Sequence, residues 1–267
     1  MNFKYDITWI MQTYLGEYPG SRADSDKKFI RAVKSFLAVN KIKPKTQLVI
    51  VSDGCEITHA LYYKLFAKHE CIKYAYVSKD GLKMYEQLKD GSTFYRGLPR
   101  QVGRTIADGY IHAFMDSDDF LMPTAATTII NWWVHMQKKA VEDGKPEYIW
   151  LACSQWYENK AQIKWMANAI TPLPYHAVGE LDKFKGLKST WQRYTMTEPM
   201  KNVLSSTWNV FHKWDCKTRW ADISSNKHLG EDSEDVAYCK GIRKEGAGVI
   251  INDAIYIRCH YTGIWDI

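Results

Sequence analysis

Short apolar runs alternate along this chain with longer segments in which apolar residues recur every three or four positions. The runs predict strands, and the recurring pattern predicts helices. The predicted strands cover residues 5–12, 47–52, 72–77, 110–115 and 147–153. Strands and helices in this order are typical of βαβ units, so the sequence predicts an α/β protein with a mostly parallel sheet flanked by helices.

The helices are predicted from their apolar faces and their flanking residues. The faces of the first two consist of Phe29, Val33, Phe36 and Leu37, and of Ile57, Leu61 and Leu65. The cluster Asp24-Ser25-Asp26 is predicted to cap the first helix. Later helices are predicted over residues 124–141 and 236–244. Because no repeat or linker interrupts the chain, we expect one domain over residues 1–267, with a distinct C-terminal portion beginning at about residue 155.

Four residues, Asp116-Ser117-Asp118-Asp119, close the fourth predicted strand. Like charges this close repel one another in a site without water, so they persist mainly where a cation or ligand compensates them. On an extended backbone, Asp116 and Asp118 would share one side and offer the hard oxygen ligands that suit Mg²⁺ or Mn²⁺. Aspartate and serine are also ordinary capping residues. The segment alone therefore fits both a metal site and an acidic turn before the next helix.

Polar residues follow three of the predicted strands, namely Gln12-Thr13-Tyr14, Asp53-Gly54 and the acidic quartet. In open α/β sheets, ligands bind beyond the carboxyl ends of the strands. The convergence of three such features predicts a nucleotide site. A dinucleotide dehydrogenase and a P-loop ATPase are excluded, because the chain lacks both GxGxxG after its first strand and GxxxxGKS/T. Bound phosphates would have to be held by a metal and by side chains.

Positive charge is concentrated in the C-terminal half. The chain has 36 Lys and Arg against 30 Asp and Glu, a net charge of +6. Residues 181–220 hold eight basic and three acidic residues, which leaves +5, and they include Trp208 and Trp214. A basic and aromatic mixture can bind sugars, a polyanion or nucleic acid, but it also fits a solvated face over an aromatic core. An acceptor platform and core packing are both open for the two tryptophans.

The cysteines and the N-terminal residues predict a cytoplasmic protein. The six cysteines are scattered and include no CxxC pair, which argues against a disulfide framework and a zinc knuckle, so we expect reduced thiols. Residues 1–6 lack the order of charged and apolar residues that marks a signal peptide. Residues 120–137 contain no Asp, Glu, Lys or Arg, but their other polar side chains favour a partly buried helix over a membrane span.

The segment from Arg100 to Asp119 closely resembles the ARNxG…DSDD segment of family 2 glycosyltransferases. Further motifs follow the order of that family: Thr13-Tyr14, Val51-Ser52-Asp53-Gly54, Thr207-Trp208-Asn209-Val210-Phe211, Gly230-Glu231-Asp232 and Arg258-Cys259-His260-Tyr261. The resemblance implies a GT-A fold, with a Rossmann-like sheet, a nucleotide-sugar donor and a divalent metal. It also implies a nucleotide-sugar-binding half over about residues 1–154 and an acceptor-binding, catalytic half over about residues 155–267.

The resemblance implies a metal site built from residues far apart in the sequence. Asp118 is the expected ligand of Mn²⁺ or Mg²⁺, with Asp116 as a second ligand or a ribose contact. His260 is the expected third ligand. An imidazole slightly favours Mn²⁺, although a lone histidine near a strand end is also a common structural residue.

The donor-binding residues follow from the same resemblance. Asp53 is expected to accept a hydrogen bond from the base, with the uracil ring N–H as the leading partner, and its alternative is a simple Asp-Gly turn. Thr13 or Tyr14 would flank or stack on that base. Arg100 would reach the donor or steady the acidic loop, and Ser117 would be the spacer of the acidic motif. Two departures from the family are Gln12, where proline is usual, and Gln101, where asparagine is usual.

Asp232 is the expected general base, which would take the proton of the attacking hydroxyl. Glu231 is the expected contact to the donor sugar. The same acidic run also fits the first turn of the helix predicted over residues 236–244, where negative charge is favourable, and both roles are compatible. The resulting prediction is an inverting glycosyltransferase that moves a sugar from a UDP-sugar to a hydroxyl acceptor.

Two other classes remain open at this level. A sugar nucleotidyltransferase also needs acidic metal ligands on an α/β sheet, but the loop over residues 16–22 is a poor version of its Gly-rich, basic loop. A non-catalytic module that binds glycan or nucleic acid would not need the acidic quartet, Asp232 and His260 together. A glycan is the expected acceptor, and a polyanion such as modified DNA is the speculative alternative, for which steep salt dependence would be the signature.

Overall fold

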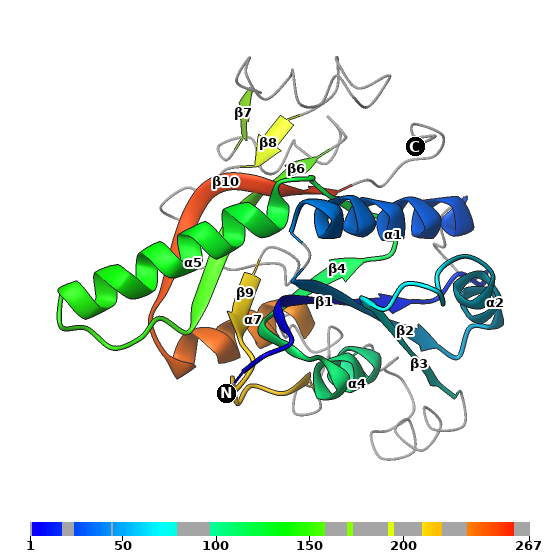
Figure 1. Ribbon diagram of the computed structural model, residues 1–267, viewed down its shortest axis with the longest axis horizontal. Helices are drawn as coiled ribbons and strands as arrows, with labels where there is room; N and C mark the ends of the chain where they lie inside the picture. Colours follow the sequence, from blue (N-terminus) through cyan, green and yellow to red (C-terminus); the bar gives the residue numbers. More distant parts are fainter. Residues whose placement is uncertain are drawn as a thin grey trace, which may run out of the picture.

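The computed structural model describes residues 2–17, 24–43, 45–78, 97–157, 170–172, 192–194, 210–220 and 234–258. Its centre is a 10-stranded sheet with the order β3-β2-β1-β4-β9-β6-β10-β5, to which β8 and β7 are added alongside β6. Figure 1 shows this sheet running through the molecule between two layers of helices. The α/β class expected from the sequence is confirmed.

Four parallel strands form the first half of the sheet. They are β1 (Tyr5–Thr13), β2 (Thr46–Asp53), β3 (Ile72–Val77) and β4 (Gly109–Asp116). Strand β1 pairs in parallel with β2 and with β4, and β2 pairs in parallel with β3. The carboxyl ends of these strands therefore lie along one edge, as the sequence predicted.

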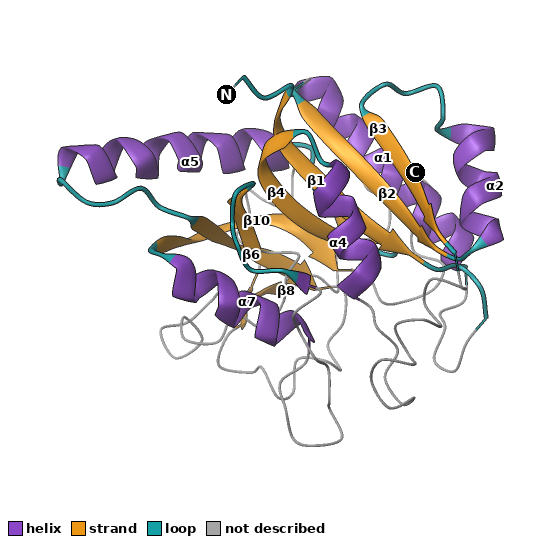
Figure 2. Ribbon diagram, turned by 90° about the horizontal axis from the view of Figure 1, so that it is seen from below, coloured by secondary structure: helices purple, strands orange, loops and turns teal. Residues whose placement is uncertain are grey.

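Helices cover both faces of this half of the sheet. They are α1 (Ser25–Ile42), α2 (Glu56–Leu65), α4 (Gly97–Ile106), α5 (Ala125–Glu142) and α7 (Glu234–Glu245). Helices α1, α2 and α5 pack on one face, and α4 and α7 pack on the other (Figures 1 and 2). Helix α4 was not predicted as an element, and its buried residues, Gly97, Pro99, Arg100 and Gly103, do not form a run of apolar positions.

The alternation of side chains along β1 divides the core between the two faces. Trp9 and Met11 point toward α1 and α5, whereas Ile10 points toward α4 and α7. On the second face, α4 approaches the sheet so closely that a Cβ atom at Gly103 would clash with Ile10 Cγ2. The absence of a side chain at Gly103 thus sets the distance between α4 and the strand ends.

The second half of the sheet is mixed. It contains β5 (Phe120–Leu121), β6 (Trp150–Tyr157), β7 (Ile170–Pro172), β8 (Gln192–Tyr194), β9 (Val210–Lys213) and β10 (Gly248–Arg258). Strand β9 runs antiparallel to both β4 and β6, and β6 runs parallel to β10. One short antiparallel strand from late in the chain therefore joins the two parallel parts.

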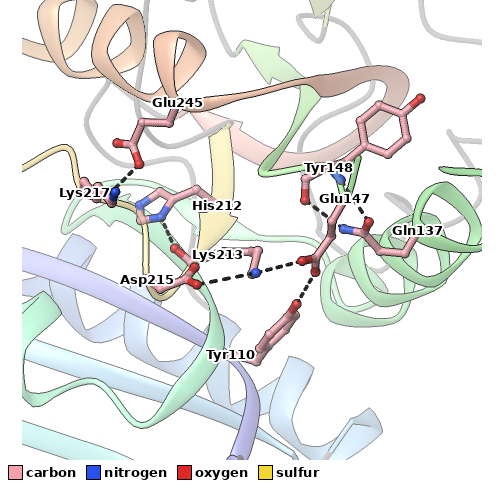
Figure 3. A network of polar contacts seen from close by, with 9 residues as sticks. All are labelled: Tyr110, Gln137, Glu147, Tyr148, His212, Lys213, Asp215, Lys217 and Glu245. Atoms are coloured by element: carbon pink, nitrogen blue, oxygen red, sulfur yellow. Dashed lines mark hydrogen bonds and ion pairs between the residues drawn. The ribbon is translucent and has the colours of Figure 1, made fainter. Parts of the chain in front are cut away.

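The strand predicted over residues 147–153 begins later than expected. Gln137 of α5 donates a hydrogen bond from Nε2 to Tyr148 O (2.8 Å) and accepts one at Oε1 from Tyr148 N (3.0 Å) (Figure 3). The backbone of Tyr148 is thereby engaged with a helix and does not join the ladder. Strand β6 starts at Trp150 and continues to Tyr157.

A polar network links the end of β9 to the start of β4. It lies at the edge of the sheet opposite the carboxyl ends of β1, β2 and β4. Lys213 Nζ lies 2.9 Å from Glu147 Oε2, and the Tyr110 hydroxyl donates to Glu147 Oε1 at 2.8 Å (Figure 3). Trp214 N donates to Tyr110 O at 2.9 Å, and its ring packs against Phe3. These contacts anchor the start of β4 and leave its other end for the acidic quartet.

The start of α1 differs from the expected side-chain cap. Asp24 is the N-cap residue, but its backbone is left-handed (φ 58°) and its side chain makes no capping hydrogen bond. The hydroxyl of Ser25 instead donates to Leu15 O at 3.2 Å, which ties the helix to the segment after β1. The tertiary contact replaces the local cap.

The described cysteines, Cys55, Cys71, Cys153, Cys216 and Cys239, are free thiols. Within the described ranges, we find no helix with the length and apolar character needed to cross a membrane.

Two histidines lie buried beneath α4 and α7. His112 on β4 and His212 on β9 are paired across the sheet, with ring centroids 5.8 Å apart, and the Tyr238 hydroxyl lies 3.0 Å from His212 Nε2. Burial, together with the positive charge of Arg104, lowers the pKa of both imidazoles, and that of His112 falls to about 3. Both rings are therefore neutral in the folded protein at neutral pH.

We predict that these histidines make the fold sensitive to acid. An unfolded histidine takes up a proton below its ordinary pKa of about 6.5, whereas folded His112 stays neutral until about pH 3, so stability falls as the pH drops through this window. At pH 5 the loss should reach about 2 kcal/mol for His112. Urea unfolding at pH 7 and pH 5 measures it. His112→Gln should lessen the pH dependence, and an unchanged dependence would contradict the account.

Candidate functional site

Three polar side chains form a row across the carboxyl ends of β2, β1 and β4. Gln12 on β1 is the direct neighbour of Asp116 on β4 in the parallel register. On its other side, Gln12 Nε2 donates a hydrogen bond to Asp53 Oδ2 at 3.3 Å. The side chains lie on the face of the sheet that α4 covers, as does Ile10 two residues earlier. We call Asp53, Gln12 and Asp116 the strand-end row.

Asp53 is 2 % exposed and lies at the end of β2, just before a sharp turn. Gly54 has a φ of 63°, a left-handed conformation that costs glycine little. The turn is closed by Ser52, whose hydroxyl donates to Cys55 O at 3.0 Å and accepts from Cys55 N at 3.1 Å. The Asp-Gly turn seen in the sequence is therefore present, and it holds a buried carboxylate at the strand end.

Thr13 lies on the opposite face of the sheet from the strand-end row. Its hydroxyl lies 3.3 Å from that of Thr58 on α2, and it is almost completely buried. Tyr14 is half-buried and packs against the core beneath α1 and α2. The side chain that stands beside Asp53 is thus Gln12, which the sequence reasoning did not select. Strict alternation along β1 was the available signal, because it places residues 12 and 13 on different faces.

The acidic quartet forms a turn, and the expected extended backbone through Asp118 is wrong. Strand β4 ends at Asp116, and Asp119 N donates to Asp116 O at 3.3 Å. The turn brings one carboxylate oxygen from each of Asp116, Asp118 and Asp119 within 4.8 Å of the others. Asp119 is fully buried, whereas the Asp116 side chain is 35 % exposed. Three carboxylates converge, one more than the alternating pattern predicted.

Polar side chains of α1 form hydrogen bonds with the backbone in and just after the acidic turn. Arg31 is buried and donates from Nη2 to Asp118 O at 2.5 Å. Just after the turn, Leu121 N donates to the hydroxyl of Ser35, one helical turn further along α1. Lys28 is buried on the same side of the helix. The stripe Lys28, Arg31 and Ser35 was missed in the sequence, although its helical spacing beside the apolar face was visible.

Arg100 joins the acidic turn to the start of α7. This buried guanidinium lies 2.8 Å from Asp235 through Nη1 and 3.7 Å from Asp116 through Nη2. It also lies 4.6 Å from the centroid of the Trp220 ring, which stacks on Tyr238 of α7 with a centroid distance of 4.1 Å. Arg100 thus contacts both the acidic turn and α7, and its role toward the donor stays a prediction.

The other predicted site residues divide into two groups. Asp232, Glu231, His260 and Trp208 lie outside the described residues. Trp214 is described, but it contacts Phe3 and Tyr110 at the amino end of β4, whereas the acidic turn follows the carboxyl end. The structure does not bring Trp214 together with the aspartates. Ser117 occupies the turn between Asp116 and Asp118.

The arrangement can bind a divalent cation and a polar ligand side by side. Three convergent carboxylates supply the oxygen ligands that Mg²⁺ and Mn²⁺ prefer. Arg31 donates to the backbone carbonyl of Asp118, and Arg100 is shared between Asp116 and Asp235. A bound cation would be attracted to the converging carboxylates. The strand-end row then extends from this acidic turn toward β2.

The fold of this chain is similar to that of solved structures of known proteins. No protein-family model matches the chain, and no curated protein matches it in sequence. Among solved structures, residues 1–349 of TarS from S. aureus match with a TM-score of 0.56 and 15% identity, over 95% of this chain and 60% of that one. The chain has a GT-A-type fold. At this identity the likeness shows the fold and nothing more, and it agrees with the architecture expected from the sequence.

Two further TarS structures give the same result. The complex with UDP-GlcNAc matches with a TM-score of 0.56 and 14% identity, over 97% of this chain and 59% of that one. The complex with UDP matches with a TM-score of 0.53 and 16% identity, over 95% and 60%. This chain therefore spans about three fifths of the TarS chains that it matches. Family 2 membership stays a prediction.

We predict that Arg100 couples the acidic turn to α7 energetically. Arg100→Met would leave Asp235 and Asp116 without their shared cation and should destabilise the fold by about 2–4 kcal/mol, toward the lower figure because Asp116 is partly exposed. Asp235→Asn in the same background should recover part of this loss, because it removes the uncompensated charge. Urea unfolding of the two single variants and the double variant measures the coupling. Strictly additive losses would contradict it.

Proposed function

We propose that this protein is a metal-dependent glycosyltransferase of the family 2 type, which transfers a sugar from a UDP-sugar to a hydroxyl acceptor with inversion. The observation that carries the proposal is the strand-end row beside the acidic turn. A buried carboxylate, an amide and three convergent carboxylates lie at the carboxyl ends of parallel strands in a GT-A-type fold. This is where α/β sheets bind nucleotides.

Breaking the bond between a sugar and a diphosphate builds negative charge on the departing nucleotide. Asp118 and Asp116, with His260 as the proposed third ligand, would hold Mn²⁺ or Mg²⁺, which supplies Lewis-acid stabilisation of that charge. Asp53 would accept a hydrogen bond from the ring N–H of uracil. Tyr14 and Thr13 would contribute to the base-binding wall. Arg31 and Arg100 keep the acidic turn in place through contacts that need no metal.

The acceptor hydroxyl must lose a proton as it attacks, and we assign this step to Asp232, with Glu231 as the contact to the donor sugar. The pairing of Arg100 with Asp235 supports this assignment. Asp235 follows Asp232 by three residues in the sequence and is linked by Arg100 to the acidic turn. An acidic residue just before α7 would therefore belong to the same region as the proposed metal.

The donor and acceptor classes rest on different support. The likeness to TarS, whose structures contain UDP-GlcNAc and UDP, favours a UDP-sugar over other donors. Residues 1–154 would bind this donor, and residues 155–267 would bind the acceptor, with Trp208 as the proposed platform. A glycan is the proposed acceptor. The net +5 of residues 181–220 would also suit a polyanionic acceptor such as modified DNA.

We expect purified protein to release UDP from at least one UDP-sugar in the presence of Mn²⁺. A screen of UDP-, GDP- and dTDP-sugars by nucleotide release, with and without glycan acceptors, measures this. Asp118→Asn should lower the rate at least about 100-fold, since Lewis-acid assistance is worth several kcal/mol. Asp215→Asn, at the opposite edge of the sheet, is the matched control and should retain the rate. Donor binding without any release would contradict the enzymatic proposal.

Asp232→Asn should abolish transfer while donor binding persists. A positioned base contributes on the order of 10²–10⁴-fold, so we expect a loss in that range. Transfer rates and UDP-sugar affinity are measured on the same preparation. Unchanged turnover would remove Asp232 from its role, and a parallel loss of donor affinity would point to a binding contact instead.

A further inference from the structure

We infer that Gln12 recognises the ribose of the nucleotide by accepting a hydrogen bond from its 2′-hydroxyl. This inference rests on the proposed function, because it assumes that the strand-end row binds a nucleotide. It makes Gln12 a specificity-determining residue that selects ribonucleotides over 2′-deoxyribonucleotides.

The neighbouring carboxylate fixes the orientation of the Gln12 amide. An amide can present either its nitrogen or its oxygen to a partner, and the two are usually assigned from their surroundings. An ionised carboxylate only accepts hydrogen bonds, so the nitrogen must face Asp53, as in the 3.3 Å contact between Nε2 and Asp53 Oδ2. The carbonyl oxygen Oε1 is consequently turned away from Asp53.

The carbonyl oxygen of Gln12 lacks a hydrogen-bond donor among the described residues. Gln12 Oε1 is buried, and no group in the described parts of the chain donates a hydrogen bond to it. Buried polar atoms are nearly always hydrogen-bonded in folded proteins, and an exception commonly marks a site for a water or a ligand. The missing partner must carry an O–H or N–H group.

The order of side chains in the row matches the order of groups in a nucleotide. Asp53 would bind the base, and the acidic turn that begins at Asp116 would bind the diphosphate through the metal. Gln12 lies between them, hydrogen-bonded to the first and paired in register with the second. The ribose lies between base and diphosphate in the nucleotide. A ribose bound in this orientation would therefore lie over the end of β1.

The position of Gln12 relative to its neighbours selects one hydroxyl. The 2′-hydroxyl is next to the carbon that carries the base, and the 3′-hydroxyl is nearer the carbon that carries the phosphates. Beyond Asp53, the row offers acceptors in the order Gln12 Oε1 and then the Asp116 carboxylate. The 2′-hydroxyl would therefore meet Gln12 Oε1, and the 3′-hydroxyl would lie toward Asp116. A neutral amide supplies this acceptor without adding a third negative charge between two carboxylates.

Isothermal titration of the full chain with UDP, 2′-deoxy-UDP and 3′-deoxy-UDP in the presence of Mn²⁺ tests the inference. The wild type should bind UDP about tenfold more tightly than 2′-deoxy-UDP, the value of one good hydrogen bond. Gln12→Met keeps the length of the side chain but has no amide oxygen. Its preference for UDP over 2′-deoxy-UDP should fall to about one, while its preference relative to 3′-deoxy-UDP stays that of the wild type.

The ratio of the affinities for UDP and 2′-deoxy-UDP distinguishes loss of the 2′-hydroxyl contact from a general disruption of the site. Losing the hydrogen bond between Gln12 and Asp53 would lower the affinity for both nucleotides by the same factor, so it would not change the ratio. Gln12→Ala, which cannot overpack the site, should give the same ratio as Gln12→Met. Asp215→Asn, at the opposite edge of the sheet, is the control and should keep the wild-type ratio. Equal binding of UDP and 2′-deoxy-UDP by the wild type overturns the inference, as does a tenfold preference that survives in both Gln12 variants.

The failure of the proposed function would look different. If the wild type binds none of the three nucleotides, the nucleotide site and the inference are overturned together. If UDP binds and the Gln12 variants alter only the ratio for 3′-deoxy-UDP, the nucleotide site stands and the assignment of the 2′-hydroxyl is wrong.

Discussion

A guanidinium buried between two carboxylates connects the halves of this molecule. Arg100 belongs to α4, Asp116 ends β4, and Asp235 lies in the first turn of the last described helix, 135 residues after Arg100 along the chain. A buried charge without a partner is costly, so separating these three groups would destabilise the fold. The close approach of α4 to the sheet at Gly103 fixes the distance from which Arg100 reaches them. The position of the acidic turn depends on this packing.

The proposed cation would bind beside this guanidinium, where three carboxylates meet. Three carboxylates converge in the acidic turn, while Arg100 divides its charge between Asp116 and Asp235, and Arg31 binds a carbonyl. The protein thus holds the backbone of the turn in place and brings its three carboxylates together. A divalent ion bound there would be attracted by these carboxylates, and its affinity would rise further with the negative charges of a diphosphate beside it.

Local patterns in the sequence were sufficient to predict the parallel strands and most of the helices that cover them. Strand β3, for example, begins and ends where the apolar run predicted. They failed where distant residues decide the outcome. Gln137 captures the backbone of Tyr148 and delays β6, and Ser25 replaces the expected cap of α1 by a bond to Leu15. In the site, the aspartates were predictable from their motif. Arg31 and Asp235 were not, because only the fold brings them to the acidic turn.

The central claim is that the acidic turn and the strand-end row bind a divalent cation and a nucleoside diphosphate as one unit. The most direct test is the linkage between the two ligands, measured by titrating UDP into the protein with saturating Mn²⁺ and again with excess EDTA. The account predicts that Mn²⁺ raises the affinity for UDP at least about tenfold, which corresponds to a coupling of about 1.4 kcal/mol. An affinity for UDP that is the same with Mn²⁺ and with EDTA would contradict it.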